Sequence, residues 1–282
     1  MMKFAFSTNA FKKFTLTEAI RSIAQTGYQG AEIMCDRPHA YPPDLTPDSL
    51  KEFKKLLKGL NLSISNLNTF MLCALGDMHH PSWIEPTLEE RAKRVQHTIN
   101  CINLAAELGV PTISTEPGGP EPEKSAFLST EKRNNLLKIF KEELAKVIPL
   151  AEKRKIKILI EPEPDLLIER SEQLEEFLKW FRTPALGINF DLGHFFCVGE
   201  DPAELIKKWG NRIDHIHLED IADNRKHQHL LPGTGAIDFP KIFRALKEIN
   251  YQGWVTVELY PYQESPVETA KKALEFLNRG LC

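Results

Sequence analysis

Short apolar runs of strand-like composition alternate with longer stretches of helical period along the whole chain. This alternation constrains the fold more than any other feature, because consecutive βα units build a parallel sheet covered by helices. The number of units is equally informative, since eight strand–helix pairs predict a single (β/α)₈ TIM barrel of the α/β class spanning residues 1–282. The predicted strands are Lys3–Thr8, Ala31–Met34, Leu62–Asn68, Thr112–Thr115, Lys157–Glu161, Gly187–Asp191, Ile213–Leu218 and Trp254–Glu258.

The helical stretches between these strands carry recognisable start and stop signals. Thr15 and Glu18 form a capping-box pattern, and the helix that follows is expected to stop at Gly27. Proline, which is tolerated in a first helical turn, opens several of the others. The later predicted helices are Leu88–Leu108, Glu131–Arg154, Ser171–Phe181, Pro202–Trp209, Pro240–Ile249 and Pro266–Asn278. Four long loops, at 36–47, 70–86, 117–129 and 219–238, each follow a strand, which in a barrel is the catalytic end.

Length and charge narrow the function. A prior of about 150 residues per domain gives about 1.9 domains for 282 residues, but eight βα units use nearly the whole length and leave no linker. The formal net charge of −3 offers no basic field, so we expect neither nucleic acid nor a membrane as partner. No apolar run approaches the ~20 residues of a membrane span, and no secretory leader is predicted. The five scattered cysteines, without a CxxC, favour a reducing, cytoplasmic setting.

Residue types that bind metals stand at the ends of the last four predicted strands, namely Glu161, Asp191, His217 and Glu258. In a barrel these ends open into the pocket, whereas strand interiors pack. Alternation along the seventh strand puts His215 and His217 on the same side, which we take as the inward one. Three carboxylates and one imidazole form an oxygen-rich set that suits Mn²⁺, Mg²⁺ or Co²⁺. The alternatives are a structural polar network, or a one-residue register shift that turns Glu161 outward.

Four phrases of the sequence stand out together, namely EPEP at 161–164, NFDLGH at 189–194, HIHLED at 215–220 and PGTGAIDFPKIFRALKEINYQGWVTVEL at 232–259. In this combination they resemble the xylose-isomerase-like TIM-barrel superfamily of sugar and sugar-phosphate isomerases and epimerases. The superfamily includes ketose 3-epimerases, hydroxypyruvate isomerases, inosose dehydratases and, more distantly, endonuclease IV. The resemblance covers essentially the whole chain, is strongest from about Lys155 to Tyr260, and does not specify one substrate.

This resemblance implies that the four strand-end residues bind one divalent metal ion, with Mn²⁺ favoured and Mg²⁺, Co²⁺ and Zn²⁺ as alternatives. It further implies that Glu161 and Glu258 lie on opposite faces of the substrate and act as acid/base partners. His194 and Arg225 match positions that usually hold substrate oxygens. The implied substrate is a small sugar or sugar phosphate. A homo-oligomer is also implied, since relatives are often dimers or tetramers.

The chemistry explains why such residues would be needed. A C–H beside a carbonyl is too weak an acid for a free carboxylate in water, but a chelated metal stabilises the enediolate while a positioned Glu removes the proton. Returning the proton to the opposite face of the same carbon gives epimerisation, and returning it to the adjacent carbon gives aldose–ketose isomerisation. Loss of a β-hydroxyl gives dehydration. We therefore expect a metal-dependent isomerase or epimerase, with an inosose-dehydratase-like lyase as the alternative.

Two other classes are less consistent with the sequence. A nuclease like endonuclease IV needs a three-zinc cluster, yet the fourth strand here leads into Glu116 rather than a histidine, and the net charge provides no phosphate-binding field. A non-catalytic sugar-binding barrel would not need to keep all four ligand types and both acid/base glutamates. Both classes remain alternatives at this point.

Further substrate contacts are proposed in the loops. Trp83 could offer an apolar platform for a sugar ring and His80 could reach a hydroxyl or the metal, although Trp83 could equally be a packed staple of its loop. Glu116 either binds substrate or is an ordinary exposed loop residue. The run from Arg225 to His229 is locally basic and either meets an anionic group or is a solvated loop. Asn9, Asn66 and Asn68 are candidates for substrate hydrogen bonds, although asparagine is also a routine turn former.

Overall fold

The computed structural model describes residues 2–70, 72, 77, 79–119 and 128–280. Eight parallel strands close into a barrel in chain order, and the first strand pairs with the last. The predicted TIM barrel is therefore confirmed, and each predicted strand matches an observed one to within one residue at either end. The strands are β1 (Lys3–Ser7), β2 (Gly30–Met34), β3 (Ser63–Asn68), β4 (Thr112–Thr115), β5 (Lys157–Ile160), β6 (Leu186–Asp191), β7 (Ile213–Leu218) and β8 (Trp254–Val257).

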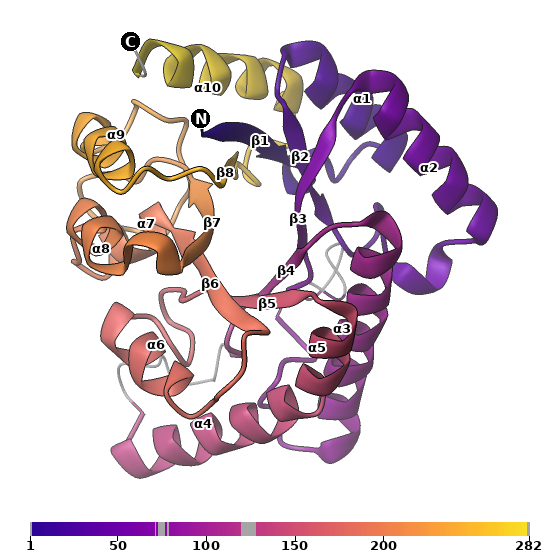
Figure 1. Cartoon of the computed structure of the whole chain (residues 1–282). Coiled ribbons are helices and arrows are strands. Elements are labelled where there is room, and N and C mark those ends of the chain that lie inside the picture. The colour runs from indigo at the N-terminus through magenta and orange to yellow at the C-terminus, as the bar shows by residue number, and fades with distance from the viewer. Residues whose placement is uncertain (1, 71, 73–76, 78, 120–127, 281–282) are drawn as a thin grey trace.

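Helices form the outer ring of the barrel, and the last helix, in yellow, packs beside the first (Figure 1). They are α1 (Leu16–Thr26), α2 (Pro47–Leu60), α3 (Leu88–Leu108), α4 (Thr130–Ala145), α5 (Ile148–Arg154), α6 (Ser171–Leu178), α7 (Leu192–Cys197), α8 (Pro202–Trp209), α9 (Phe239–Glu248) and α10 (Pro266–Gly280). Short 3₁₀ turns lie at Thr8–Phe11, Pro42–Asp44 and Gly210–Arg212. In the part of the chain that the structure describes, no helix is both long and apolar enough to cross a membrane.

Helix boundaries follow local chemistry, with two departures from the prediction. The Thr15–Glu18 capping box is present, and Gly27 ends α1 in the left-handed conformation with φ of 99°. The predicted single helix Glu131–Arg154 is wrong, because Pro149 has no amide hydrogen and is tolerated only in the first turn of a new helix, α5. The helix that starts at Ser171 ends at Leu178 rather than at Phe181. Parts of two predicted loops, 71, 73–76, 78 and 120–127, lie outside the described residues.

The barrel register shifts at two places. One shift lies between Ala31 and Glu32 where β2 pairs with β3, and the other lies between Ile188 and Asn189 where β6 pairs with β7. Such irregularities change the direction of the side chains beside them. Glu32 and Asn189 are both fully buried, and both hydrogen-bond to histidines of β7. Both register shifts therefore lie next to buried polar side chains that contact β7 inside the barrel.

The apolar core lies between the strands and the helix ring, and it supports the strand ends. Phe140 of α4 stacks on Phe177 of α6 with ring centroids 4.7 Å apart, and Trp83 lies 5.8 Å from Phe140. Burying one large apolar side chain contributes about 1.5 to 3 kcal/mol. Helix packing of this kind holds the strand ends, and the residues that follow them, in fixed positions.

Candidate metal centre

Four side chains from adjacent strands converge inside the mouth of the barrel. Glu161 and Glu258 directly follow β5 and β8, Asp191 ends β6, and His217 lies near the end of β7. One ligand-type atom from each residue lies within 4.8 Å of the others, and all four residues are buried. The structure therefore brings together the four residues singled out in the sequence. That they bind a metal ion stays a prediction.

His217 lies at the centre of this cluster. Its Nδ1 lies 2.7 Å from Glu161 Oε1, 3.8 Å from Asp191 Oδ2 and 3.7 Å from Glu258 Oε2. Asp191 Oδ2 is buried, and no nitrogen or hydroxyl group among the described residues donates a hydrogen bond to it. A buried carboxylate oxygen without a donor is costly, and a cation at this point would supply the missing partner. One imidazole nitrogen and three carboxylates are a donor set that fits a divalent ion.

Glu32, in the middle of β2, sets the orientation of His217. Its Oε2 accepts hydrogen bonds from His217 Nε2 at 2.8 Å and from Asn66 Nδ2 at 2.9 Å. Burial raises the pKa of Glu32, but the charge and hydrogen bond of His217 outweigh burial and lower it to about 2. When the imidazole is neutral, Glu32 holds its proton on Nε2, so that the Nδ1 lone pair faces the cluster, as behind many metal-binding histidines. Glu32 is not among the site residues predicted from the sequence. The sequence feature that could have indicated it is a charged residue in the middle of an otherwise apolar strand.

Asparagine amides hold two of the carboxylates in place. Asn9 Nδ2 donates to Glu258 Oε1 at 2.8 Å, and Asn68 Nδ2 donates to the same oxygen at 3.5 Å. Asn189 Nδ2 donates to Glu161 Oε2 at 2.7 Å. Asn9 and Asn68, considered as substrate contacts from the sequence, therefore support a carboxylate of the cluster.

Negative charge is crowded at this point of the barrel. Burial raises the pKa of Glu258 to about 8, and the charges of Glu161, Glu32 and Asp191 contribute in the same direction, against the opposing effect of His217. Buried like charges destabilise the ionised form of each carboxyl group. A bound cation would remove this penalty, because it would be the largest local positive charge. The electrostatics of the cluster thus fit a divalent ion as well as its donor atoms do.

The second histidine of β7 supports the cluster from below. His215 Nδ1 lies 2.7 Å from Asn189 Oδ1, and its Nε2 lies 2.8 Å from Thr256 Oγ1. Burial lowers the pKa of His215 to about 3, so the ring is neutral at ordinary pH. Both ring nitrogens are engaged by neighbours, which makes His215 part of the hydrogen-bonded floor.

A small pocket opens above the cluster on the side where the chain leaves the strands. Its lining residues are Asn9, Lys12, Asn68, Phe70, His79, Glu116, Glu163, His194, His227, His229, Glu258 and Tyr260. His194 and Glu116, both predicted to contact substrate, are among them. His194 Nδ1 is fixed by the carbonyl oxygen of Pro162 at 2.9 Å, so its Nε2 remains as the nitrogen available to other groups.

Residues 225–229 include side chains exposed to solvent and side chains that line the pocket. His229 is 1% exposed, and its Nδ1 donates to the backbone oxygen of Glu258 at 2.8 Å. His227 is half-buried, with its Nε2 3.3 Å from His229 Nε2. One ring nitrogen each of His194, His227 and His229 lies within 4.8 Å of the others, which is another of the arrangements able to hold a cation. The solvated-loop alternative for this run is therefore wrong at its two histidines.

Arg225 lies away from the pocket, contrary to the role that the resemblance implied. It has a positive φ of 57°, in a turn closed by the hydrogen bond from its amide to the carbonyl oxygen of Ala222. Its guanidinium group stacks over the ring of Phe196 at 4.3 Å and donates to the backbone oxygen of that residue. The turn directs the side chain toward the surface beside α7 and α8. Arg225 is therefore not among the described residues that line the pocket.

Trp83 and His80 also lie outside the pocket lining. Trp83 is 1% exposed and donates its indole hydrogen to Thr115 Oγ1 at 2.9 Å, so it is a packed residue and presents no open ring face. The His80 side chain is 46% exposed and pairs with Glu85 at 2.7 Å. His79, its neighbour in sequence, lines the pocket instead. The packed-staple alternative for Trp83 therefore describes the structure.

Glu116 and Glu163 form a second pair of carboxyl groups in the pocket. Burial raises the pKa of Glu116 well above its usual range, and the charge and hydrogen bond of Glu163 raise it further. Glu163 is not among the residues predicted from the sequence. It stands two positions after Glu161 in the EPEP phrase, where alternation would place it on the same side of an extended chain.

Comparisons with known proteins agree with this geometry. An inosose dehydratase of Clostridium perfringens is 30% identical over 286 residues, which cover 94% of this chain and 90% of that protein. A solved D-tagatose 3-epimerase-like protein is 25% identical over 100% of both chains, with a TM-score of 0.77. The IolI protein, solved with a binding zinc atom, shares the fold at 21% identity and a TM-score of 0.80 over 99% of this chain and 98% of its own. The family model described as xylose isomerase-like TIM barrel matches residues 20–280, and the chain belongs to that family.

Proposed function

We propose that this protein is a divalent-metal-dependent isomerase or epimerase of a small polyhydroxy carbonyl compound such as a sugar. The cluster of Glu161, Asp191, His217 and Glu258 carries the proposal, because its ligand-type atoms lie within 4.8 Å of one another beneath a pocket at the catalytic end of the barrel. Glu258 belongs to both the cluster and the pocket lining. A carboxylate that borders both a metal site and a substrate is suited to proton transfer.

The four cluster residues would hold the ion, with Glu32 orienting His217 from behind. When bound, such an ion withdraws electron density from a substrate carbonyl and makes the neighbouring C–H more acidic. The oxygen-rich donors favour Mn²⁺, Mg²⁺ or Co²⁺. The zinc atom in the IolI protein supports keeping Zn²⁺ among the candidates.

Glu161 and Glu258 would exchange protons with the substrate. One carboxylate removes the proton from the carbon beside the carbonyl, and the other returns a proton to the opposite face of that carbon or to its neighbour. The first outcome is epimerisation and the second is isomerisation. Asn9 and Asn189 hold the two carboxylates in fixed orientations, so that little reorganisation is needed when a proton moves. His194 would present Nε2 to a substrate oxygen.

A dehydratase is the second candidate. It is favoured by the 30% identity to the inosose dehydratase of Clostridium perfringens over nearly the whole chain. Removal of the same proton leads to loss of water when the substrate carries a hydroxyl on the next carbon. His194, in the pocket lining, would then give a proton to the departing hydroxyl.

A deuterium-exchange screen tests both candidates. The protein is incubated in D₂O with added Mn²⁺ and with ketoses, their phosphates and inososes, and the products are followed by NMR and mass spectrometry. An isomerase or epimerase incorporates deuterium beside the carbonyl and loses no atoms. A dehydratase yields a product lighter by one water. Sugar binding without any deuterium incorporation would contradict the proposal and indicate a non-catalytic barrel.

A further inference from the structure

We propose that the Asp220 carboxylate is a clamp that fixes the β7–α9 loop, residues 221–238, over the pocket and so positions the histidines of that loop. The proposal rests on the proposed function, because it adds a positioning residue to the same site. It also gives a physical role to the PGTG phrase at 232–235, whose residues belong neither to the metal cluster nor to the described pocket lining.

The Asp220 side chain accepts hydrogen bonds from four backbone amides of this loop. Its Oδ1 accepts from Ile221 at 2.9 Å and from Ile237 at 3.1 Å. Its Oδ2 accepts from Gly233 at 2.9 Å and from Gly235 at 2.7 Å. Asp220 is 1% exposed, and hydrogen bonds to a buried carboxylate are among the stronger ones in proteins. One side chain thus joins the first residue of the loop to three residues near its end.

Two glycines allow the backbone to approach the carboxylate this closely. A Cβ atom at Gly235 would lie 2.3 Å from the Ile221 carbonyl oxygen and 2.5 Å from Asp220 Oδ1. Gly233 has a φ of 86°, a left-handed conformation that favours glycine. Both glycines present their amides to the same carboxylate oxygen. The PGTG phrase is therefore the sequence feature that indicates the clamp.

The clamp acts on the pocket through His229. Asp220 also pairs with Leu230 through both backbone hydrogen bonds of an antiparallel bridge, at 2.9 Å and 2.7 Å. The neighbouring His229 has its Nδ1 2.8 Å from the backbone oxygen of Glu258, and its ring centroid lies 4.6 Å from that of Tyr260. All three of these residues line the pocket. Releasing the loop would therefore move a wall of the pocket beside a proposed proton-transfer residue.

The experiment compares wild type with Asp220→Asn, which keeps the shape of the side chain but replaces one acceptor oxygen by a donor. Asp223→Asn, an exposed aspartate of the same loop, is the matched control. Gly235→Ala disturbs the clamp from the opposite side. Gly59→Ala in α2 is its control, because a Cβ atom there would make no close contact with the described residues outside its own helical turn. Circular dichroism verifies that each protein is folded.

Two readouts use the Mg²⁺-loaded protein without substrate. Backbone hydrogen–deuterium exchange at 221–238, followed by mass spectrometry, should rise at least about tenfold in Asp220→Asn and Gly235→Ala and keep the wild-type rate in both controls. NMR of protein with isotopically labelled histidine should show a protected Nδ1–H signal of His229, assigned by its absence from His229→Gln. The two clamp variants should lose this signal. Unchanged loop exchange or a retained His229 signal in Asp220→Asn would overturn the proposal.

The third readout tests positioning in the reaction of the Mn²⁺-loaded enzyme. With the best substrate of the deuterium-exchange screen, kcat/KM should fall about tenfold in Asp220→Asn and stay within about twofold of wild type in Asp223→Asn. Mn²⁺ affinity, measured by competition with a chelator, should stay within about twofold in both, because no cluster residue belongs to the loop.

A purely structural role would lower Tm and leave kcat/KM of the folded Asp220→Asn protein unchanged, and this result would overturn the proposal. If no substrate of the screen reacts with wild type, the proposed reaction fails, and the two readouts without substrate still decide whether Asp220 clamps the loop.

Discussion

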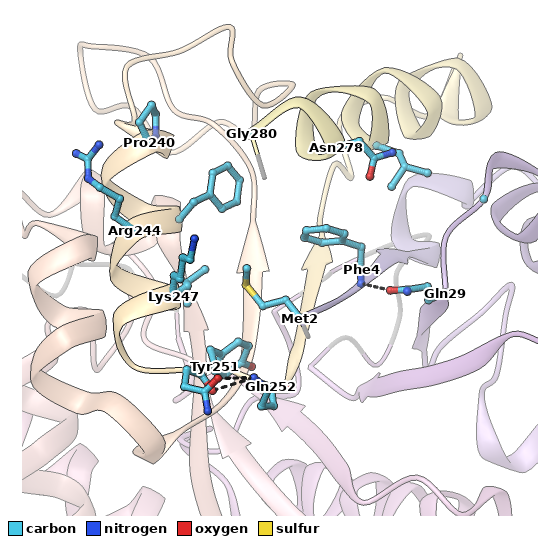
Figure 2. A pocket seen from close by; sticks show the side chains of 15 residues that line it. Met2, Phe4, Gln29, Pro240, Arg244, Lys247, Tyr251, Gln252, Asn278 and Gly280 are labelled. Carbon is cyan, nitrogen blue, oxygen red and sulfur yellow. Dashed lines mark hydrogen bonds between the residues drawn. The ribbon is translucent and has the colours of Figure 1, made fainter. Parts of the chain in front are cut away.

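Two cavities lie at opposite ends of the barrel and differ in what lines them. The larger, about 750 Å³, lies where the chain enters the strands, between α9, α10 and the start of β1. Figure 2 shows Arg244 and Lys247 of α9 on one side of it and Phe4 and Gln29 on the other. The smaller, about 60 Å³, lies where the chain leaves the strands and includes Glu258.

Under the proposed function the active site is the smaller of the two cavities, so volume alone does not identify it. None of the groups of metal-ligand side chains found among the described residues includes a residue of the larger cavity. The smaller pocket lies directly above such a group, although its volume is only about 60 Å³. Chemistry in a barrel is concentrated where several strand ends point polar side chains at one spot.

Glu258→Gln should give the largest effect. The amide cannot act as a base and is a weaker ligand, so deuterium exchange should fall by about 10²- to 10⁴-fold. Circular dichroism should show a folded protein, because the change removes one of several crowded charges. Glu248→Gln, on the exposed surface of α9, is the control and should behave as wild type. Retained exchange in the Glu258 variant would remove this residue from the proton-transfer pair.

Glu32→Gln should weaken metal binding by about 10- to 100-fold, since Glu32 orients His217 without belonging to the four-residue cluster. Competition with a chelator of known affinity measures the effect. Glu52→Gln, an exposed position of α2, controls for the loss of one negative charge. Equal affinity in both variants would mean that Glu32 is only a packing partner of the histidine.

Asn9→Ala should lower kcat by about tenfold with a smaller change in KM. The variant loses the 2.8 Å hydrogen bond to Glu258, and one such bond to a charged group contributes about 1.5 to 3 kcal/mol. Steady-state kinetics with the best substrate of the screen measures the effect. Asn278→Ala, in the lining of the larger cavity, is the comparison. If the two alanine variants were indistinguishable, Asn9 would have no positioning role.

Arg244→Ala and Lys247→Ala should give the smallest effect, below about twofold in exchange rate, because exposed substitutions away from a site usually change little. Both side chains border the larger cavity (Figure 2). The measurement is the same exchange assay at fixed substrate and metal concentration. A tenfold loss in either variant would show that the larger cavity contributes to the reaction and that the contrast between the two ends is incorrect.

The fold could be predicted because its signals are local. Strand periodicity, proline positions and the Thr15–Glu18 capping box each depend on a few neighbouring residues. The four cluster residues could be singled out for a related reason, since a ligand type at the end of a strand is visible in the sequence. Once the order of the strands is known, Asp191 and His217 are expected to lie close together, because β6 and β7 are neighbours.

The remaining residues depend on tertiary structure. His229 reaches the pocket because Leu230 pairs with Asp220 in an antiparallel bridge, which folds the loop after β7 back over the barrel. Arg225 leaves the pocket because of a single turn with positive φ. Glu32 meets His217 across the barrel from a strand far away in sequence. Contacts of this kind leave no periodic pattern in the sequence, because they depend on how loops and opposite strands pack.

Metal content is the most direct test of the central claim that the strand ends form a metal centre. Protein purified without chelator is measured by elemental analysis, together with Asp191→Asn, His217→Gln and the control Arg244→Ala. We expect about one equivalent of divalent metal in wild type and in the control, and almost none in the two cluster variants. Metal-free wild type whose exchange activity is unchanged by EDTA would contradict the claim.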